Sequence, residues 1–261
     1  MSEHPIAARW RALGDPGQAR ALIPYVTAGF PTAATSRDLL RAVAAAGADF
    51  VEVGVPFSDP LADGPTIQRT TQAALDQGMT AAGVLDLIRE AALAIPIIIM
   101  TYLNPVLAYG VDRFVADAHA AGASGLLLTD LPAGADPVIE NAVTSSALAL
   151  IRLIAPTTDD RRLTTALSGA TGFVYLISRL GVTGAREQVP PDLEQNLRRV
   201  RAATKLPVAV GFGIGTPAQA AAAARHADGV VVGSALMDAL AQGGVRAAEQ
   251  LTRQLAEAVH A

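Results

Sequence analysis

The sequence repeats one short stretch, AAGAD at residues 45–49 and AAGAS at residues 120–124. Before each copy lies an alanine-rich segment with helical spacing, and after it comes a run of apolar residues. A glycine at this point can end a helix in a left-handed conformation, after which the chain enters a strand. The repeat therefore indicates a unit in which a helix leads directly into a buried strand.

Eight apolar runs have the length and composition of buried strands: residues 22–26, 50–53, 97–102, 125–128, 149–153, 173–177, 207–210 and 230–233. Between them, segments such as 36–46, 111–121 and 192–203 have the polar starts and apolar spacing of helices that cover a parallel sheet. Eight such units in about 250 residues are typical of a closed (β/α)8 TIM barrel. A doubly wound open sheet is the structural alternative.

No linker rich in Pro, Gly or Ser divides the chain, so we expect residues 1–261 to form one barrel domain. The amphipathic residues 6–13, which include Trp10, are expected to form an extra N-terminal helix over one barrel end.

Composition excludes several classes of function. The chain has 51% hydrophobic residues, 17% charged residues and no cysteine, so it can bury a large core without disulfides, thiolate catalysis or Cys-ligated zinc. The net charge of −4 gives no general attraction to nucleic acid, and the four histidines lack the spacing of a shared metal site. The apolar runs are shorter than the ~20 residues of a membrane span, and no leader is evident. We expect a cytoplasmic protein.

One carboxylate lies inside an apolar strand. The two-residue period of a strand puts Phe50, Glu52 and Gly54 on one face and Val51 and Val53 on the other, and one of these sets looks into the barrel. A buried carboxylate is costly unless it is paired or its pKa rises. Glu52 is therefore a candidate general acid/base; the alternative is a strand-end glutamate that reaches solvent or an arginine.

Two further acidic residues, Asp59 and Asp63, follow in a loop rich in Gly and Pro. Either of them could cap a helix or form a turn. Their proximity to Glu52 also allows a second carboxylate in the same pocket, so that two groups with different pKa values divide acid and base roles.

Glycine-rich stretches follow the last three strands: GVTG at 181–184, GFGIG at 211–215 and GSA at 233–235. Glycines let backbone N–H groups approach an anion, and a helix N-terminus adds a favourable dipole, so these turns predict a phosphate site. Tyr102, Tyr175 and Phe212 lie at or near strand ends and could line an apolar pocket. Residues 178–188, with Arg179 and Thr183, form either a lid or an ordinary loop, and Asn104 and Asp130 could simply cap turns.

In chain order, several motifs together resemble the tryptophan synthase α subunit family: IPYVTAG at 23–29, EVGVPFSDPLADGP at 52–65, NP at 104–105, SRLGVTG at 178–184, GFGI at 211–214 and GSA at 233–235. The resemblance covers nearly the full chain. It implies a (β/α)8 barrel that cleaves indole-3-glycerol phosphate to indole and glyceraldehyde 3-phosphate in the last steps of tryptophan biosynthesis.

The resemblance also implies roles for single residues. Glu52 would transfer protons at indole C3 and at the cleaving hydroxyl, and Asp63 would accept the indole N–H. The phosphate would lie at Gly184, Gly213, Gly233 and Ser234, and the remaining expected substrate contacts are Tyr102, Tyr175, Thr183 and Phe212. Departures from the family pattern stand at Tyr25, Phe30 and Leu180.

The family implies a partner, a β subunit that uses pyridoxal phosphate to join indole to serine, usually in an α2β2 tetramer. No cofactor is then expected in this chain. Loops after the second, third and fourth strands would contact the partner through Pro56, Phe57, Asp59, Asn104 and Asp130, and docking would help to close Arg179 over the site.

Three alternatives remain. A lysine aldolase would have to use Lys205, the only lysine, which precedes a strand and so belongs at the opposite barrel face. A metal aldolase would need clustered histidines. A catalytically idle barrel that only activates a partner is the third.

Overall fold

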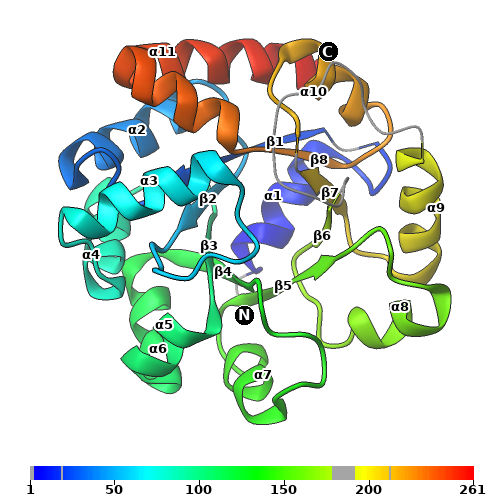
Figure 1. Ribbon diagram of the computed structural model, residues 1–261. Coiled ribbons are helices and arrows are strands. Elements are labelled where there is room, and N and C mark those ends of the chain that lie inside the picture. The colour runs from blue at the N-terminus through cyan, green and yellow to red at the C-terminus, as the bar shows by residue number, and fades with distance from the viewer. Residues whose placement is uncertain (1–2, 19, 178–191, 212) are drawn as a thin grey trace.

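The computed structural model describes residues 3–18, 20–177, 192–211 and 213–261. Eight parallel strands pair in chain order and close into a barrel (Figure 1). They are β1 (Ala21–Thr27), β2 (Val51–Gly54), β3 (Ile97–Thr101), β4 (Ala123–Leu128), β5 (Ala149–Ile154), β6 (Val174–Ile177), β7 (Val208–Gly211) and β8 (Gly229–Val232). Pairing of Ala21 with Gly229 and of Pro24 with Val232 joins the first strand to the last. The closed barrel is confirmed and the open sheet is excluded.

In the described part of the chain, α1 (Pro5–Leu13) lies across one end of the barrel, and the other helices surround it (Figure 1): α2 (Ala33–Ala45), α3 (Pro65–Asp76), α4 (Ala81–Ala91), α5 (Leu103–Tyr109), α6 (Val111–Ala121), α7 (Pro137–Thr144), α8 (Asp160–Ala166), α9 (Leu193–Ala203), α10 (Pro217–Ala224) and α11 (Ser234–His260). Among the described residues, none of the helices combines the length and hydrophobicity that crossing a membrane requires.

The repeated stretch behaves as its glycine predicts. Gly122 caps α6 in the left-handed region at φ 105° and ψ 8°, and Gly47 follows α2 at φ 105°. Both joints deliver the chain into a fully buried strand within a few residues. Strand and helix boundaries differ from the expected ones by up to three residues; for example, Thr32 caps α2 by accepting from the N–H of Thr35, so this helix starts at residue 33 rather than 36.

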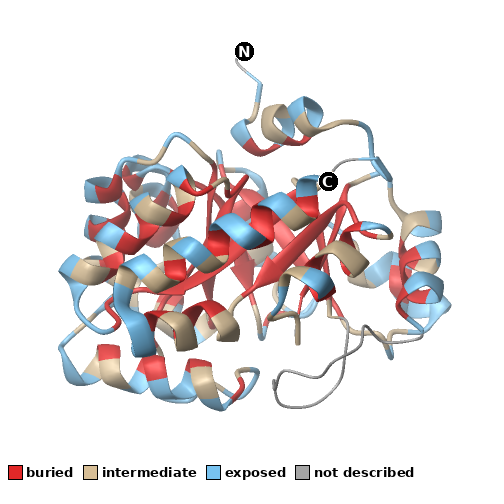
Figure 2. Cartoon of the chain, turned by 90° about the horizontal axis from the view of Figure 1, so that it is seen from above, coloured by how far each residue is buried: buried red, intermediate tan, exposed pale blue. Residues whose placement is uncertain are grey.

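The N-terminal helix closes one end of the barrel, as expected (Figure 2). Its Trp10 is 4% exposed, and the Trp10 ring lies 4.8 Å from that of Phe50 and 5.8 Å from that of Phe173, measured between centroids. Because Phe50 thus points into the barrel interior, Glu52 and Gly54 on the same face of β2 point there too. A functional site of the kind that barrels carry is then expected at the other end, where the strands finish.

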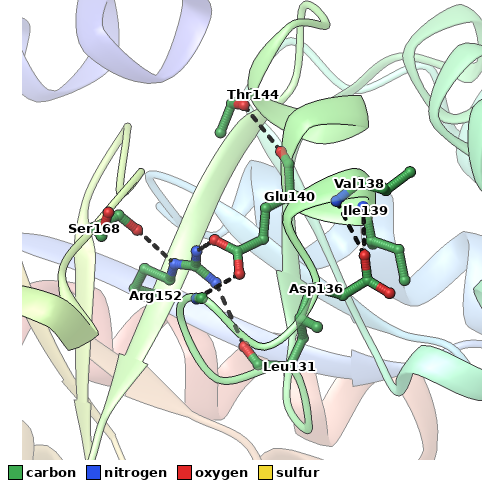
Figure 3. Close-up of polar contacts among 9 residues, drawn as sticks. Leu131, Asp136, Val138, Ile139, Glu140, Thr144, Arg152 and Ser168 are labelled. Atoms are coloured by element: carbon green, nitrogen blue, oxygen red, sulfur yellow. Dashed lines mark hydrogen bonds and ion pairs between the residues drawn. The ribbon is translucent and has the colours of Figure 1, made fainter.

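A largely buried ion pair joins β5 to the helix that packs on it, α7. Arg152, whose side chain is 5% exposed, pairs with Glu140 of α7 and donates to the carbonyl oxygens of Ser168, at 3.0 Å, and of Leu131 (Figure 3). Glu140 also accepts from the N–H of Gly134 at 2.6 Å. These contacts fix the loop between β4 and α7 to the barrel wall.

Candidate active site

A cavity of about 800 Å³, counted with its open mouth, lies at the carboxyl ends of the strands. Its lining comes from strands at opposite ends of the sequence and from the loops that follow them: Tyr25, Glu52, Asp63, Gly64, Thr66, Ile67, Met100, Tyr175, Gly213, Ile214, Gly215, Val231, Gly233, Ser234, Ala235 and Asp238. The cavity therefore unites the carboxylates predicted from the early strands with the glycines predicted from the late ones.

Glu52 is 1% exposed, and neither of its carboxylate oxygens has a hydrogen-bond partner among the described residues. Burial alone raises the pKa of Glu52 from 4.5 to about 8. Within the described part of the chain no arginine pairs with Glu52, and the side chain does not reach solvent, so the strand-end alternative does not apply. At neutral pH the group is mostly protonated, and a neutral carboxyl facing an open cavity is suited to donate a proton and then take one back.

Asp63 occupies the loop between β2 and α3 and lines the same cavity. Burial raises the pKa of Asp63 to about 6, while a hydrogen bond from Tyr102 acts in the opposite direction. The Tyr102 hydroxyl donates to Oδ2 of Asp63 over 3.0 Å and accepts from the N–H of Ala62 over 2.9 Å. Tyr102, directly after β3, thus holds both the side chain and the backbone of this loop.

Two tyrosine side chains lie against glycines of the neighbouring strands, Tyr25 of β1 against Gly54 of β2 and Tyr175 of β6 against Gly211 of β7. A Cβ at Gly54 would lie 2.0 Å from the hydroxyl of Tyr25, and a Cβ at Gly211 would lie 1.9 Å from that of Tyr175. Burial and the nearby Glu52 and Asp63 carboxylates raise the pKa of both hydroxyls, so both stay protonated. Gly54 and Gly211 therefore create the space in which the tyrosine hydroxyls approach the cavity.

The opposite wall of the cavity is formed by backbone. Gly213 has φ +85°, and a Cβ there would meet nothing within 4 Å. Gly233 precedes Ser234, the first residue of α11, and no side chain caps this helix. A helix N-terminus without a side-chain cap, opening onto a cavity next to a glycine, can hold an anion through its N–H groups.

The residues predicted for partner contact lie around the rim. Asp59 and Asn104 are exposed, Pro56 is buried, and Phe57 is half-buried with its ring 5.3 Å from that of Tyr102. Asp130 is exposed, yet its Oδ1 accepts from the N–H of Leu103 over 2.7 Å, while Asp59 accepts from the Ser58 hydroxyl over 2.6 Å. Two of these side chains therefore stabilise loops as well as facing outward.

Several predicted site residues lie outside the described part of the chain, namely Arg179, Thr183, Gly184 and Phe212, together with the departure Leu180. Their roles stay predictions. Lys205 is exposed just before β7, at the opposite end of the barrel from the cavity, which excludes it as a Schiff-base lysine here. Among the described residues, no cluster of three or more His, Cys, Asp or Glu side chains could hold a metal ion.

Sequence reasoning missed two polar residues of the lining, Thr66 and Asp238. A signal for Asp238 exists in hindsight, because it stands four residues after Ser234 and so lies on the same face of the helix. Thr66 follows Asp63 by three residues, but only the fold shows that it meets a helix from the far end of the chain.

A family model described as tryptophan synthase alpha chain matches residues 15–261. Among curated proteins, the tryptophan synthase alpha chain of Acidiphilium cryptum is 50% identical over 241 residues, covering 91% of this chain and 87% of that protein. That of Granulibacter bethesdensis is 48% identical, with 97% and 95% covered.

Solved structures agree. A chain of Mycobacterium tuberculosis tryptophan synthase matches with a TM-score of 0.92 at 39% identity, each chain being covered completely. The tryptophan synthase subunit alpha of Legionella pneumophila matches with a TM-score of 0.89 at 33% identity over 99% of both chains.

Proposed function

The chain belongs to the tryptophan synthase alpha chain family and cleaves indole-3-glycerol phosphate in tryptophan biosynthesis, and from this premise we propose how its own residues act. We propose that the chain works as one barrel domain, with Glu52 as the proton-transfer group and Asp63 as the acceptor of the indole N–H. The observation that carries the proposal is the shared cavity, in which an unpartnered buried carboxyl and a second carboxyl face a glycine-lined wall.

Substrate orientation follows from the lining. The indole ring takes the apolar part of the cavity, beside Met100, Val231 and Tyr175. The glycerol phosphate reaches the other wall, where Gly213, Gly233 and Ser234 offer N–H groups and the dipole of α11 to the dianion. Because no lysine or arginine lines this cavity among the described residues, the backbone provides the phosphate contacts.

The reaction needs no net proton. Neutral Glu52 donates a proton to indole C3, and Asp63 stabilises the positive charge that the ring gains. The Glu52 carboxylate then takes the proton of the hydroxyl on the adjacent side-chain carbon. The bond between C3 and that carbon breaks, its electron pair restores the indole ring, and the carbon becomes the aldehyde of glyceraldehyde 3-phosphate. Glu52 ends protonated, ready for another cycle.

The test is indole release from indole-3-glycerol phosphate by the purified chain, alone and with a β subunit. We expect release in both cases, and loss of at least ~10-fold when Asp63 is replaced by Asn. A wild-type chain that releases no indole even with the β subunit would favour the idle-barrel alternative and refute the proposal.

A β subunit partner is implied by the family. The alpha chain family carries no cofactor itself, so we propose that pyridoxal phosphate is held by the β subunit of an α2β2 tetramer.

We propose that the rim of the loops after β2, β3 and β4 is the docking surface. All three large hydrophobic side chains exposed in the described chain belong to these units: Leu61 (93% exposed), Leu107 (48%) and Val138 (79%). Apolar groups exposed together with polar rim residues are typical of a protein interface.

Docking is tested better at Leu61 than at Phe57, since the Phe57 ring packs on Tyr102 and so supports Asp63. Leu61→Asp combined with Leu107→Asp should weaken β subunit binding at least ~10-fold in a titration. Lys205→Asp, at the opposite end of the barrel, is the control and should leave the dissociation constant unchanged. Equal affinity of the double variant and the wild type would show that another surface docks.

A further inference from the structure

Asp238 of α11 lines the cavity and contacts α3, the helix that begins just after Asp63. It stands one helical turn after Ser234 on α11, so both residues face the cavity that they line. Thr66, the second residue of α3, donates its hydroxyl to the Asp238 carboxylate, at 3.3 Å from Oδ1 and 3.2 Å from Oδ2. Arg69, one turn further along α3, donates from Nη2 to Oδ1 over 2.7 Å.

The same helix is tied to the barrel by a second polar contact. Thr70 shares a buried hydrogen bond of 2.8 Å with Thr27 of β1, and the N–H of Thr27 donates to the sulfur of Met237 on α11 at 3.4 Å. Helices α3 and α11 therefore lie side by side over β1 (Figure 1), where hydroxyl and charged groups join them in addition to apolar packing. Such contacts depend on distance and direction more strongly than apolar packing does.

Two consequences follow for the ends of the substrate. Asp63 precedes α3 by two residues, so the place where α3 begins sets the place of Asp63. Ser234 begins α11, so the position of α11 sets the phosphate wall. A carboxylate beside a phosphate site would repel the dianion, and the ion pair of Asp238 with Arg69 offsets part of this repulsion.

We propose that Asp238 is a positioning residue for cleavage: through Thr66 and Arg69 it fixes the distance between the phosphate wall and Asp63. The inference rests on the proposed function. A misplacement of about 1 Å between groups that grip opposite ends of one substrate can cost a large part of the rate. The effect should appear only for a ligand that spans both ends.

The experiment uses the full chain and measures steady-state cleavage of indole-3-glycerol phosphate, together with calorimetric binding of glycerol 3-phosphate and of indole as separate fragments. We expect Asp238→Ala to lower kcat/KM about 10-fold while the dissociation constant of each fragment changes less than about 2-fold. Asp238→Asn keeps an oxygen for Thr66 and should recover part of the loss.

A matched control exists on the same helix. Glu249 pairs with Arg253 over 2.7 Å, the distance seen for Arg69 and Asp238, and the side-chain exposures of the two pairs are similar. Glu249→Ala should leave kcat/KM unchanged. A second experiment places Asp238→Ala in an Asp63→Asn background. There it should lower kcat/KM by less than about 2-fold, because the carboxylate that Asp238 positions is already absent.

Three results would overturn the proposal: wild-type kcat/KM in Asp238→Ala, an equal loss with and without Asp63, or weaker binding of both fragments. If Asp238→Ala fails to fold, Thr66→Val removes one bond to the same carboxylate and is measured in its place. Failure of the wild type to release indole would instead contradict the proposed function, so the two failures are distinguishable.

Discussion

Replacing Glu52 by glutamine should stabilise the folded protein at alkaline pH. In the unfolded chain this carboxyl ionises near pH 4.5, whereas burial in the barrel raises the pKa of Glu52 to about 8. Between these values the native state binds more protons than the unfolded state, so the free energy of unfolding falls as pH rises. This loss of stability begins near pH 4.5, the pKa in the unfolded chain, and is complete above about pH 8, the pKa in the folded protein.

The magnitude follows from the separation of the two pKa values. At about 1.36 kcal/mol per pKa unit, the full loss of stability above pH 8 is at most about 5 kcal/mol, and entry of water around the ionised group would reduce it. Glutamine has the same size and no charge, so the variant escapes this cost. Asp63, whose pKa is also raised, is present in both proteins and cancels in the comparison.

The assay is urea unfolding of both proteins at about pH 5 and about pH 9. We expect the variant to gain less than about 1 kcal/mol over the wild type at the lower pH and more than that, up to about 5 kcal/mol, at the higher one. Glu257→Gln, which alters an exposed glutamate of α11, is the control and should show no such change. A gain that is the same at both pH values would refute the account of Glu52 as a buried, unpaired carboxyl.

Three further changes test other parts of the site and fold. Gly54→Ala puts a Cβ 2.0 Å from a tyrosine hydroxyl and should lower kcat/KM at least ~10-fold in the indole-release assay, with the far-UV spectrum unchanged. Tyr102→Phe removes the bond that lowers the pKa of Asp63, so the pKa of Asp63 should rise above about 6, as carboxyl NMR titration would show. Arg152→Ala leaves the largely buried Glu140 without its ion-pair partner and should cost up to about 3–5 kcal/mol in urea unfolding, while the conservative Glu140→Gln should cost less.

Local signals in the sequence predicted the barrel well. The glycines of the two repeated joints adopt the left-handed conformations that end their helices, and the apolar runs form all eight strands. The direction of Glu52 could not be decided locally, because both faces of β2 are buried. Only the packing of Phe50 against Trp10, from a helix 40 residues away, shows which face looks inward.

Contacts between residues far apart in the sequence could not be predicted either, because local patterns do not show which distant segments pack together. The bond between Thr66 and Asp238 joins residues 172 positions apart, and neither residue stands out in its own segment. Phe57 was expected at the partner surface because an exposed aromatic can anchor an interface, yet its ring also packs on Tyr102. Local patterns thus located the strand ends, while the fold decided which side chains meet there.

The rate of indole release by Glu52→Gln tests the central claim most directly. The variant should bind indole-3-glycerol phosphate with the wild-type dissociation constant, since the phosphate wall and Asp63 are untouched, and should cleave it at least ~10²-fold more slowly. That combination would assign proton transfer to Glu52. Turnover within a few-fold of the wild type would contradict the claim and remove Glu52 from the mechanism.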